Sequence, residues 1–388
     1  MTRHAEEYIL LGLRLGRHVD GLVDAYYGPS ELKEQVDAEP LTEPAALAAE
    51  GDALLAELDD GWLRDQMIGL RAYAGQLAGE EISYSDEVER CYGVRPARQA
   101  TDVYREAHER LDELLPGEDE LAERYQAWRR TCTVPAELVV PALQDAAAEL
   151  RSATTGIVDL PAGEEVLVEA VESEPWWAFN YYLGGLRSRV VVNLDVPTTC
   201  HEVVHLAAHE IYPGHHAEHA LKEQLLIRDR GQVEESIQMV PTPAALVQEG
   251  IAELGPSLVR DDDLEERLVA ALRRRGLDYD AERSNAIAEA RRSLRRIGVD
   301  AALMIHEDGA SIEDARAYVQ RWSLVTAEEA AHSVSFVVDP TWRAYTITYS
   351  AGRELCEAWV GGDPARFARL LTEQVRIAEL LEPHPDGH

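Results

Sequence analysis

Most of the chain carries apolar residues at the spacing of an amphipathic helix. In residues 5–27, apolar positions such as Ile9 and Leu10 recur at this spacing, and the pair Gly28-Pro29 then stops the pattern. The same periodicity predicts further helices over residues 43–78 with a break near 59–61, 84–91, 96–115, 118–131 and 135–154. The first 155 residues are therefore predicted to be helical throughout, without a cluster of metal ligands.

Two short stretches have a different pattern. EEVLVEA (164–170) and SRVVVNLD (188–195) are rich in β-branched residues and are predicted to be strands. Between them lies an aromatic segment, residues 175–182, followed by Gly184-Gly185. We interpret these aromatic side chains mainly as packing residues, and the alternative is that they line a substrate cleft.

Helical periodicity returns after the second strand. Thr198 or Thr199 can cap a helix that runs to about Tyr212, Pro213-Gly214 interrupts it, and a second helix continues through Leu226. Further helices are predicted over residues 243–259, 263–275, 279–297, 311–321, 326–333, 340–360 and 364–381, with a strand-like segment at 333–339. The chain is thus expected to be mainly α, with an N-terminal helical region (1–155) and a second region (156–388) packed as one continuous unit.

Charge and cysteine usage exclude several classes of protein. The chain has 72 acidic against 37 basic residues and a net charge of −35, so it repels nucleic acid and anionic membranes, and we discount both as partners. Its four cysteines lie far apart and form no CxxC pair, which argues against a thiolate zinc site and a disulfide framework. Without a long apolar segment at the N-terminus or elsewhere, the protein is expected to be cytoplasmic.

One segment concentrates residues suited to metal binding. HEVVHLAAHEIYPGHHAEH (201–219) contains six of the 13 histidines, with glutamates interleaved. A histidine-rich polar helix surface is the alternative interpretation. A hydrolytic zinc site needs two histidines from one helix, a third ligand from elsewhere, and a glutamate beside the metal that acts on water.

Two motifs within this segment compete for that role. His201 and His205 have the literal HExxH spacing, which places two histidines on one helical face. The second motif begins at His209, but its i+4 position is Pro213, so the helix must kink or bulge there. A bulge would let His215, at i+6, reach the place of the second ligand. A site shifted to His205 and His209 is a further alternative.

The third ligand is predicted to come from the segment VQEGIAE (247–253). Glu249 and Glu253 share one face of a helix, so that one can bind the metal while the other hydrogen-bonds a ligating histidine. A solvated charged face is the alternative, but the flanking residues are apolar and Gly250 would permit close backbone approach.

These segments carry a family resemblance. HEIYPGHH (209–216) and EGIAE (249–253) resemble the bacterial family called domain of unknown function 885, whose members resemble gluzincin metallopeptidases. The segments VDAALMIH (299–306) and YSAGR (349–353) are similar to later family elements, and GLVDAYYGP (21–29) matches loosely. The resemblance covers roughly residues 180–380. It implies a large helical metallopeptidase-like fold with a central cleft and a short β element near the metal helix.

The resemblance also implies roles for individual residues. One zinc ion per chain would be bound by His209, His215 and Glu249, with Glu253 supporting a ligating histidine and Glu210 acting as general base. Tyr349 would stabilise the oxyanion, and His306 would do the same or hold substrate. The strand 188–195 is placed to pair with an extended substrate.

The expected function is that of a zinc-dependent hydrolase, most simply a peptidase acting on short peptides or amino-acid conjugates. The alternative is a metal-binding protein without hydrolytic activity, which serves storage, sensing or structure. The oligomeric state is left open by the sequence.

Overall fold

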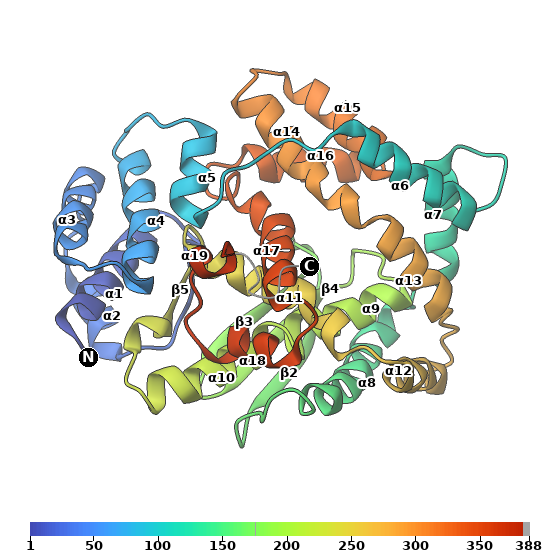
Figure 1. The fold of residues 1–388 in the computed structure, drawn as a ribbon, viewed down its shortest axis with the longest axis horizontal. Helices are drawn as coiled ribbons and strands as arrows, with labels where there is room; N and C mark the ends of the chain where they lie inside the picture. The colour runs from blue at the N-terminus through green and yellow to red at the C-terminus, as the bar shows by residue number, and fades with distance from the viewer. Residues whose placement is uncertain (175, 383–388) are drawn as a thin grey trace.

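The computed structural model describes residues 1–174 and 176–382 and is mainly helical, as predicted (Figure 1). Pro175, part of the aromatic segment, lies outside the described residues. The first region contains α1 (Arg3–Gly16), α2 (Ser30–Ala38), α3 (Pro44–Glu57), α4 (Trp62–Leu77), α5 (Tyr84–Tyr92), α6 (Thr101–Leu114), α7 (Leu121–Cys132) and α8 (Ala136–Thr154). Helices α3 to α8 follow the predicted ranges closely, whereas α2 was not predicted.

The second region continues with helices that are often broken into shorter turns. Its first part contains α9 (Cys200–Leu206), the π-helical turn η1 (Ala207–Ile211), α10 (His215–Lys222), η2 (Glu223–Arg228), η3 (Val233–Ser236), α11 (Pro243–Val259), α12 (Asp262–Arg274) and α13 (Ala281–Ala290). Its second part contains η4 (Arg292–Arg296), α14 (Ile297–His306), α15 (Ile312–Ser323), α16 (Ala327–Val338), η5 (Tyr345–Ile347), η6 (Thr348–Gly352), α17 (Arg353–Val360), α18 (Pro364–Thr372) and α19 (Ile377–Leu380).

The predicted helix over 5–27 is wrong in its second half. Helix α1 ends at Gly16, and Val23–Tyr26 forms strand β1, which pairs antiparallel with β5 (Ile237–Met239). A strand whose partner lies more than 200 residues away leaves no local periodicity that distinguishes it from a helix end. The predicted strand at 333–339 is also wrong, because this stretch belongs to α16. A capping box of Thr326 and Glu329 begins that helix, and Ala330, Val334 and Val337 form its buried face.

The two predicted strands near the metal segment are confirmed, but the expected arrangement is not. Strand β2 (Glu165–Val171) pairs parallel with β4 (Arg187–Asn193), which pairs antiparallel with β3 (Ala178–Gly184). The sheet order is therefore β2-β4-β3, and β4 is central. Because both its edges are already paired, this strand cannot add an extended substrate, which corrects the sequence-based expectation. The edge strand nearest the metal segment is β3, whose Asn180 donates a hydrogen bond of 2.5 Å to the carbonyl oxygen of Glu210.

Helix α11 is the centre of the molecule. Figure 1 shows it between the N-terminal helices α1 to α4 on one side and α8 and α12 on the other. Most residues of α11 are buried, including both glutamates predicted to serve the metal site. A Cβ atom at Gly250 would lie 2.5 Å from the carbonyl oxygen of Gly352, so the backbones of α11 and η6 touch only because both residues are glycine. The close approach expected at Gly250 is therefore present.

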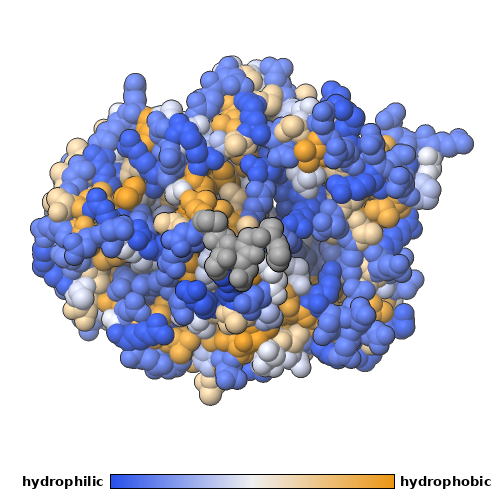
Figure 2. Space-filling model, viewed as in Figure 1, coloured by the Kyte–Doolittle hydropathy of each residue, from blue (hydrophilic) through white to orange (hydrophobic). Residues whose placement is uncertain are grey.

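The surface agrees with the composition of the chain. The face drawn in Figure 2 is dominated by hydrophilic residues. Among the described residues, no helix combines the length and the apolar character that a bilayer span requires.

Candidate metal centre

The break in the histidine-rich segment is a π-helical turn followed by a restarted helix. Thr199 and Glu202 cap the start of α9, which passes directly into η1, and α10 begins at His215. A π-turn carries one residue more than an α-helical turn, so it shifts the faces of the residues that follow. The rings of His209 and His215 consequently lie edge to face with their centroids 4.8 Å apart, which is the approach that the i+6 spacing required.

Gly214 makes this approach sterically feasible. Its backbone N–H donates to the carbonyl oxygen of Ala208 at 3.0 Å, and a Cβ atom at this position would lie only 1.8 Å from the carbonyl oxygen of His209. Any side chain would therefore push α10, and His215 with it, away from the first histidine.

His209, His215 and Glu249 form a group that could hold a metal ion. The ligand atoms of the three side chains all lie within 4.8 Å of one another. Glu249 Oε2 is 3.5 Å from His209 Nε2, and Glu249 Oε1 is 3.5 Å from His215 Nε2. These separations are long for hydrogen bonds, and Glu249 Oε2 is a buried oxygen without a hydrogen-bond partner among the described residues. Two imidazoles and one carboxylate are the donor set of a hydrolytic zinc site, so these residues fit the metal.

The pKa values of Glu249 and His215 depend strongly on each other's charge. Burial raises the pKa of Glu249, but His215, His209 and the hydroxyl of Tyr345 outweigh it and lower the value to about 2. For His215 burial lowers the pKa, and the carboxylates of Glu249 and Glu210 reverse this and raise it to about 9. A metal ion binding here would displace the proton of His215, because only a neutral imidazole can ligate.

Glu253 faces the opposite side of the same histidine. Its Oε1 lies 3.6 Å from His209 Nδ1 and 3.9 Å from His205 Nε2, which makes a second group of potential ligands. Glu253 is also paired with Arg295, whose charge opposes a cation at this position. This arrangement matches the supporting role expected for Glu253, in which a carboxylate holds the second ring nitrogen of a ligating histidine.

Glu210 lies on the π-turn, directly after His209. The residue is 7% exposed, and burial raises the pKa of its carboxyl group to about 7. The neighbouring charges act in both directions: His215 lowers the pKa, whereas Glu249 and Asp24 raise it. A carboxyl group with a pKa near neutrality can accept and return a proton at physiological pH, which is what a general base requires.

Tyr349 is close to the same charges. Burial, followed by the carboxylates of Glu249 and Glu210, raises the pKa of its hydroxyl group well above the usual value, so this hydroxyl keeps its proton. Its ring packs edge to face on Tyr345, whose hydroxyl donates a hydrogen bond of 2.7 Å to Glu249 Oε1. Tyr349 itself remains 37% exposed. The structure therefore places a protonated, solvent-accessible donor beside the candidate site.

His306 is placed differently from the expectation. It ends α14, where its Nε2 lies 2.9 Å from the carbonyl oxygen of Val337 and its ring stacks on Tyr84. These contacts occupy the imidazole within the packing of α14 and α16, so the structure does not bring it to the histidine–glutamate group. Asp300, its companion in the family-like segment, is buried and accepts hydrogen bonds from Tyr104 and Tyr318.

Asp24 is a further carboxyl group that the charges of the candidate site influence. It lies on β1, and desolvation by the surrounding protein raises the pKa of its carboxyl group to about 6. After desolvation, the largest influences on this pKa are the charge of His215, which lowers it, and that of Glu249, which raises it. The only signal in the sequence was the loosely matching segment GLVDAYYGP (21–29), which had been assigned to the first helix.

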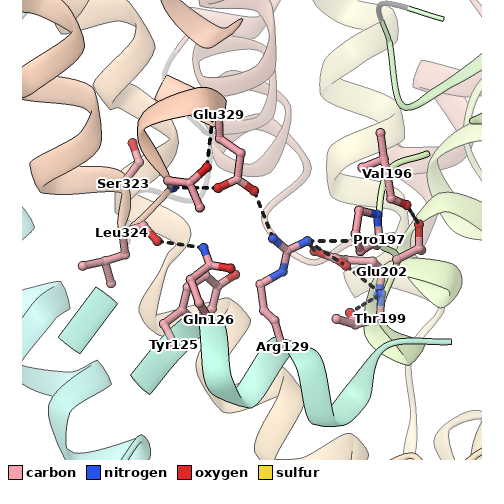
Figure 3. Close-up of polar contacts among 12 residues, drawn as sticks. Tyr125, Gln126, Arg129, Val196, Pro197, Thr199, Glu202, Ser323, Leu324 and Glu329 are labelled. Atoms are coloured by element: carbon pink, nitrogen blue, oxygen red, sulfur yellow. Dashed lines mark hydrogen bonds and ion pairs between the residues drawn. The ribbon is translucent and has the colours of Figure 1, made fainter. Parts of the chain in front are cut away.

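Two residues of the literal HExxH motif, Glu202 and His201, make structural contacts. Glu202 completes the capping box of α9 and pairs with Arg129, which also contacts Glu329 on α16 (Figure 3). His201 contacts the hydroxyl of Tyr279 at 3.5 Å and belongs to neither group of potential ligands among the described residues. A carboxylate that caps a helix and pairs with an arginine is not free to act on water.

His216 and His219 are polar neighbours, as predicted. His216 is fully buried, with its ring nitrogens 2.8 Å from Ser188 Oγ and 2.9 Å from Glu164 Oε2. His219 packs against Tyr182 and stacks on His215.

Comparison with known proteins identifies relatives by fold only. Neither a family model nor a curated protein matches the chain. The fold resembles the crystal structure of a candidate lipoprotein from Colwellia psychrerythraea, with 16% identity and a TM-score of 0.54, over 90% of this chain and 57% of the other. It also resembles a candidate lipoprotein of unknown function from Shewanella oneidensis, with 13% identity and a TM-score of 0.50, over 91% of this chain and 69% of the other. The chain thus spans little more than half the length of the first of these proteins.

Proposed function

We propose that the chain is a zinc-dependent hydrolase that cleaves amide bonds in short peptides or amino-acid conjugates. The observation that carries this proposal is Glu210, a buried carboxyl group with a pKa raised to about 7 that follows directly after the shared ligand candidate His209. A metal site that serves only structure or storage has no use for such a group. The resemblance of HEIYPGHH and EGIAE to gluzincin-like proteins supports the same function.

In this proposal each side chain has a separate task. His209, His215 and Glu249 would hold the metal, which when bound lowers the pKa of water and polarises a carbonyl group. Glu210 takes the proton of the attacking water and passes it to the leaving amine. Tyr349, which keeps its proton, donates a hydrogen bond to the developing oxyanion. The cytoplasmic location expected from the sequence stays a prediction.

The decisive experiment compares two glutamates that both follow a histidine. Zinc-loaded protein is tested on a library of short peptides, with and without chelator, as wild type, Glu210→Gln and Glu202→Gln. We expect wild-type cleavage that chelator abolishes and zinc restores. Glu210→Gln should keep its zinc but lose about 10²–10⁴ in turnover. Glu202→Gln should keep its turnover, since its carboxylate caps a helix, and lose only stability.

Two results would contradict this assignment. If Glu210→Gln loses zinc and regains full activity in excess zinc, Glu210 is a ligand rather than a base. If wild-type protein binds one zinc ion per chain and cleaves nothing in the library, the alternative of a non-hydrolytic metal-binding protein is favoured.

A further inference from the structure

A pocket of about 250 Å³ lies on the Glu253 side of His209. It is formed where α9, α11, α13, η4 and α17 meet, and its lining includes His205, Glu253, Arg260, Arg292, Arg295 and Arg353. Figure 2 shows a hydrophilic hollow near the place where Figure 1 draws α17 next to the segment from α13 to α14. The side chains of Arg292 and Arg295 are 38% and 39% exposed, so the pocket opens to solvent.

We call this cavity the arginine pocket. Its concentration of arginines is unusual in so acidic a protein. The chain has a net charge of −35, yet four guanidinium groups gather here against two lining carboxylates, Glu253 and Glu289. Burial and the charge of Arg353 lower the pKa of Arg295 to about 10, although its side chain is 39% exposed. The accumulated positive charge is thus not fully compensated by the protein.

These arginines differ in how completely carboxylates of the protein neutralise their charge. Arg295 pairs with Glu253, and Arg292 pairs with Glu289 at 3.4 Å and with Glu357. Arg260 is exposed and forms no ion pair within residues 1–174 and 176–382. Arg353 donates a hydrogen bond to the backbone carbonyl oxygen of Glu253, but its buried Nε has no partner in the same residues, and its ion pair with Glu357 is long, at 4.0 Å.

The two histidines of the pocket add no negative charge. An imidazole side chain is neutral or positively charged, so neither ring can neutralise an arginine. The charge of Arg260 is therefore left without an ion-pair partner among the described residues, and Arg353 has only its long pair with Glu357. An arginine offers several N–H donors in a planar fork, which binds carboxylate or phosphate oxygens in pairs.

We propose that the arginine pocket binds an anionic group of the substrate, a carboxylate or a phosphate, while the neighbouring bond lies at the metal centre. This inference rests on the proposed function. The spatial link is Glu253, which contacts Arg295 in the pocket and His209 in the metal group. The preferred substrate is accordingly a short peptide or conjugate that carries a negatively charged end.

Binding tests the pocket independently of turnover. In the Glu210→Gln background, the protein is titrated by calorimetry with N-acetyl-alanyl-alanine, with the C-terminal amide of that dipeptide, and with inorganic phosphate, before and after chelator treatment. We expect the acid to bind at least about tenfold more tightly than the amide, the size expected for one hydrogen bond between charged groups. Displacement of the acid by phosphate would indicate that the pocket accepts any oxyanion, and failure of phosphate to displace it that it selects carboxylates.

Variants locate the binding to this pocket. Arg260→Gln, at an exposed position, and Arg292→Gln should each remove most of the preference for the acid. Arg105→Gln removes the same charge from an exposed pair with Asp102 on α6 and serves as the matched control. Melting temperatures check that each variant is folded. The proposal is overturned if acid and amide bind equally, or if Arg260→Gln and Arg292→Gln behave like Arg105→Gln.

Turnover separates the two proposals. If the protein is a hydrolase, Arg260→Gln should raise KM about tenfold for peptide acids and leave peptide amides unchanged. Equal KM values of wild type and Arg260→Gln for acids would overturn the pocket assignment and leave the hydrolase intact. Acid binding that depends on Arg260 in a protein without hydrolytic activity would support the pocket and overturn the proposed function.

Discussion

Glu249 and Glu253 lie one turn apart on α11 and face opposite nitrogens of the same imidazole ring, that of His209. The surroundings of Glu249 are two histidines and a tyrosine hydroxyl, and one of its oxygens is buried without a hydrogen-bond partner among the described residues. The surroundings of Glu253 include two arginines besides His205 and His209: Arg295 pairs with its carboxylate, and Arg353 donates to its backbone carbonyl.

This difference shows how neighbouring residues give two identical side chains different roles. A cation is favoured beside Glu249, because the neighbours of this carboxylate are two imidazoles and a tyrosine hydroxyl. None of these groups is a permanent cation that would neutralise the carboxylate. A cation is opposed beside Glu253, where permanently charged guanidinium groups already neutralise the carboxylate. The same two segments of the chain would thus build the proposed metal site on one side of His209 and the proposed anion pocket on the other.

The largest expected effect is loss of the metal. His209→Ala, His215→Ala and Glu249→Ala should each abolish tight binding of about one zinc ion per chain, because each removes one of the three proposed protein ligands. Elemental analysis of purified protein measures this, and His201→Ala is the control from the same histidine-rich segment. The assignment of Glu249 as ligand and Glu253 as supporting residue would be wrong if His205→Ala or Glu253→Ala abolished zinc binding while His215→Ala retained it.

Tyr349 should affect turnover without affecting the metal. Loss of one hydrogen-bond donor to an oxyanion costs about 10²–10³ in turnover, so Tyr349→Phe should slow peptide cleavage by that order with its zinc content unchanged. Steady-state kinetics at saturating zinc measure the effect. Tyr345→Phe is the contrasting variant, since it removes the hydrogen bond to Glu249 and should weaken zinc binding instead. Unchanged turnover in Tyr349→Phe would remove this residue from the mechanism.

Glu253 should show the opposite behaviour to Tyr349. Glu253→Gln keeps the size of the side chain but weakens the contact that holds His209 Nδ1, so zinc affinity should fall about 10–100-fold. Turnover at saturating zinc should change much less. Competition with a chelator of known affinity measures the first quantity, and a complete loss of zinc would show instead that Glu253 is a ligand.

The smallest effect on zinc binding is expected one residue beyond His215, where His216 contacts Glu164 instead of a candidate ligand. Burial raises the pKa of Glu164, but hydrogen bonds from His216, Tyr212 and Arg151 outweigh it and lower the value to about 2. A carboxyl group with a folded pKa below its unfolded pKa stabilises the protein fully above the unfolded value, near 4.5, and loses this contribution as pH falls towards 2.

The corresponding variant is Glu164→Gln. It should lose about 3 kcal/mol of stability at neutral pH and show a flatter decline between about pH 5 and pH 2, with zinc content unchanged. Denaturant unfolding at several pH values tests this. An unaltered pH dependence would mean that Glu164 is not the group responsible.

The periodicity of the sequence determined the mainly helical fold because amphipathic helices are encoded locally. The break between α3 and α4 and the capped start of α9 could be located to within a few residues for this reason. The spacing of His209, Pro213 and His215 also demanded a bulge, since no regular helix brings positions i and i+6 together, and the π-turn of η1 supplies it.

Pairing and burial were decided only by the tertiary structure. Strand β1, and Asp24 with it, depends on a partner in β5 that local periodicity cannot reveal, and the central place of β4 depends on β3 closing its second edge. In the sequence, His306 and Tyr349 were equally good candidates for stabilising the oxyanion. In the fold, the ring of His306 packs against Tyr84 and contacts the carbonyl oxygen of Val337, whereas Tyr349 lies close to the charge of Glu249. The sequence determined which residue types were present for metal chemistry. Only the fold decided which carboxylate met histidines and which met arginines, because that choice depends on contacts between segments far apart in the chain.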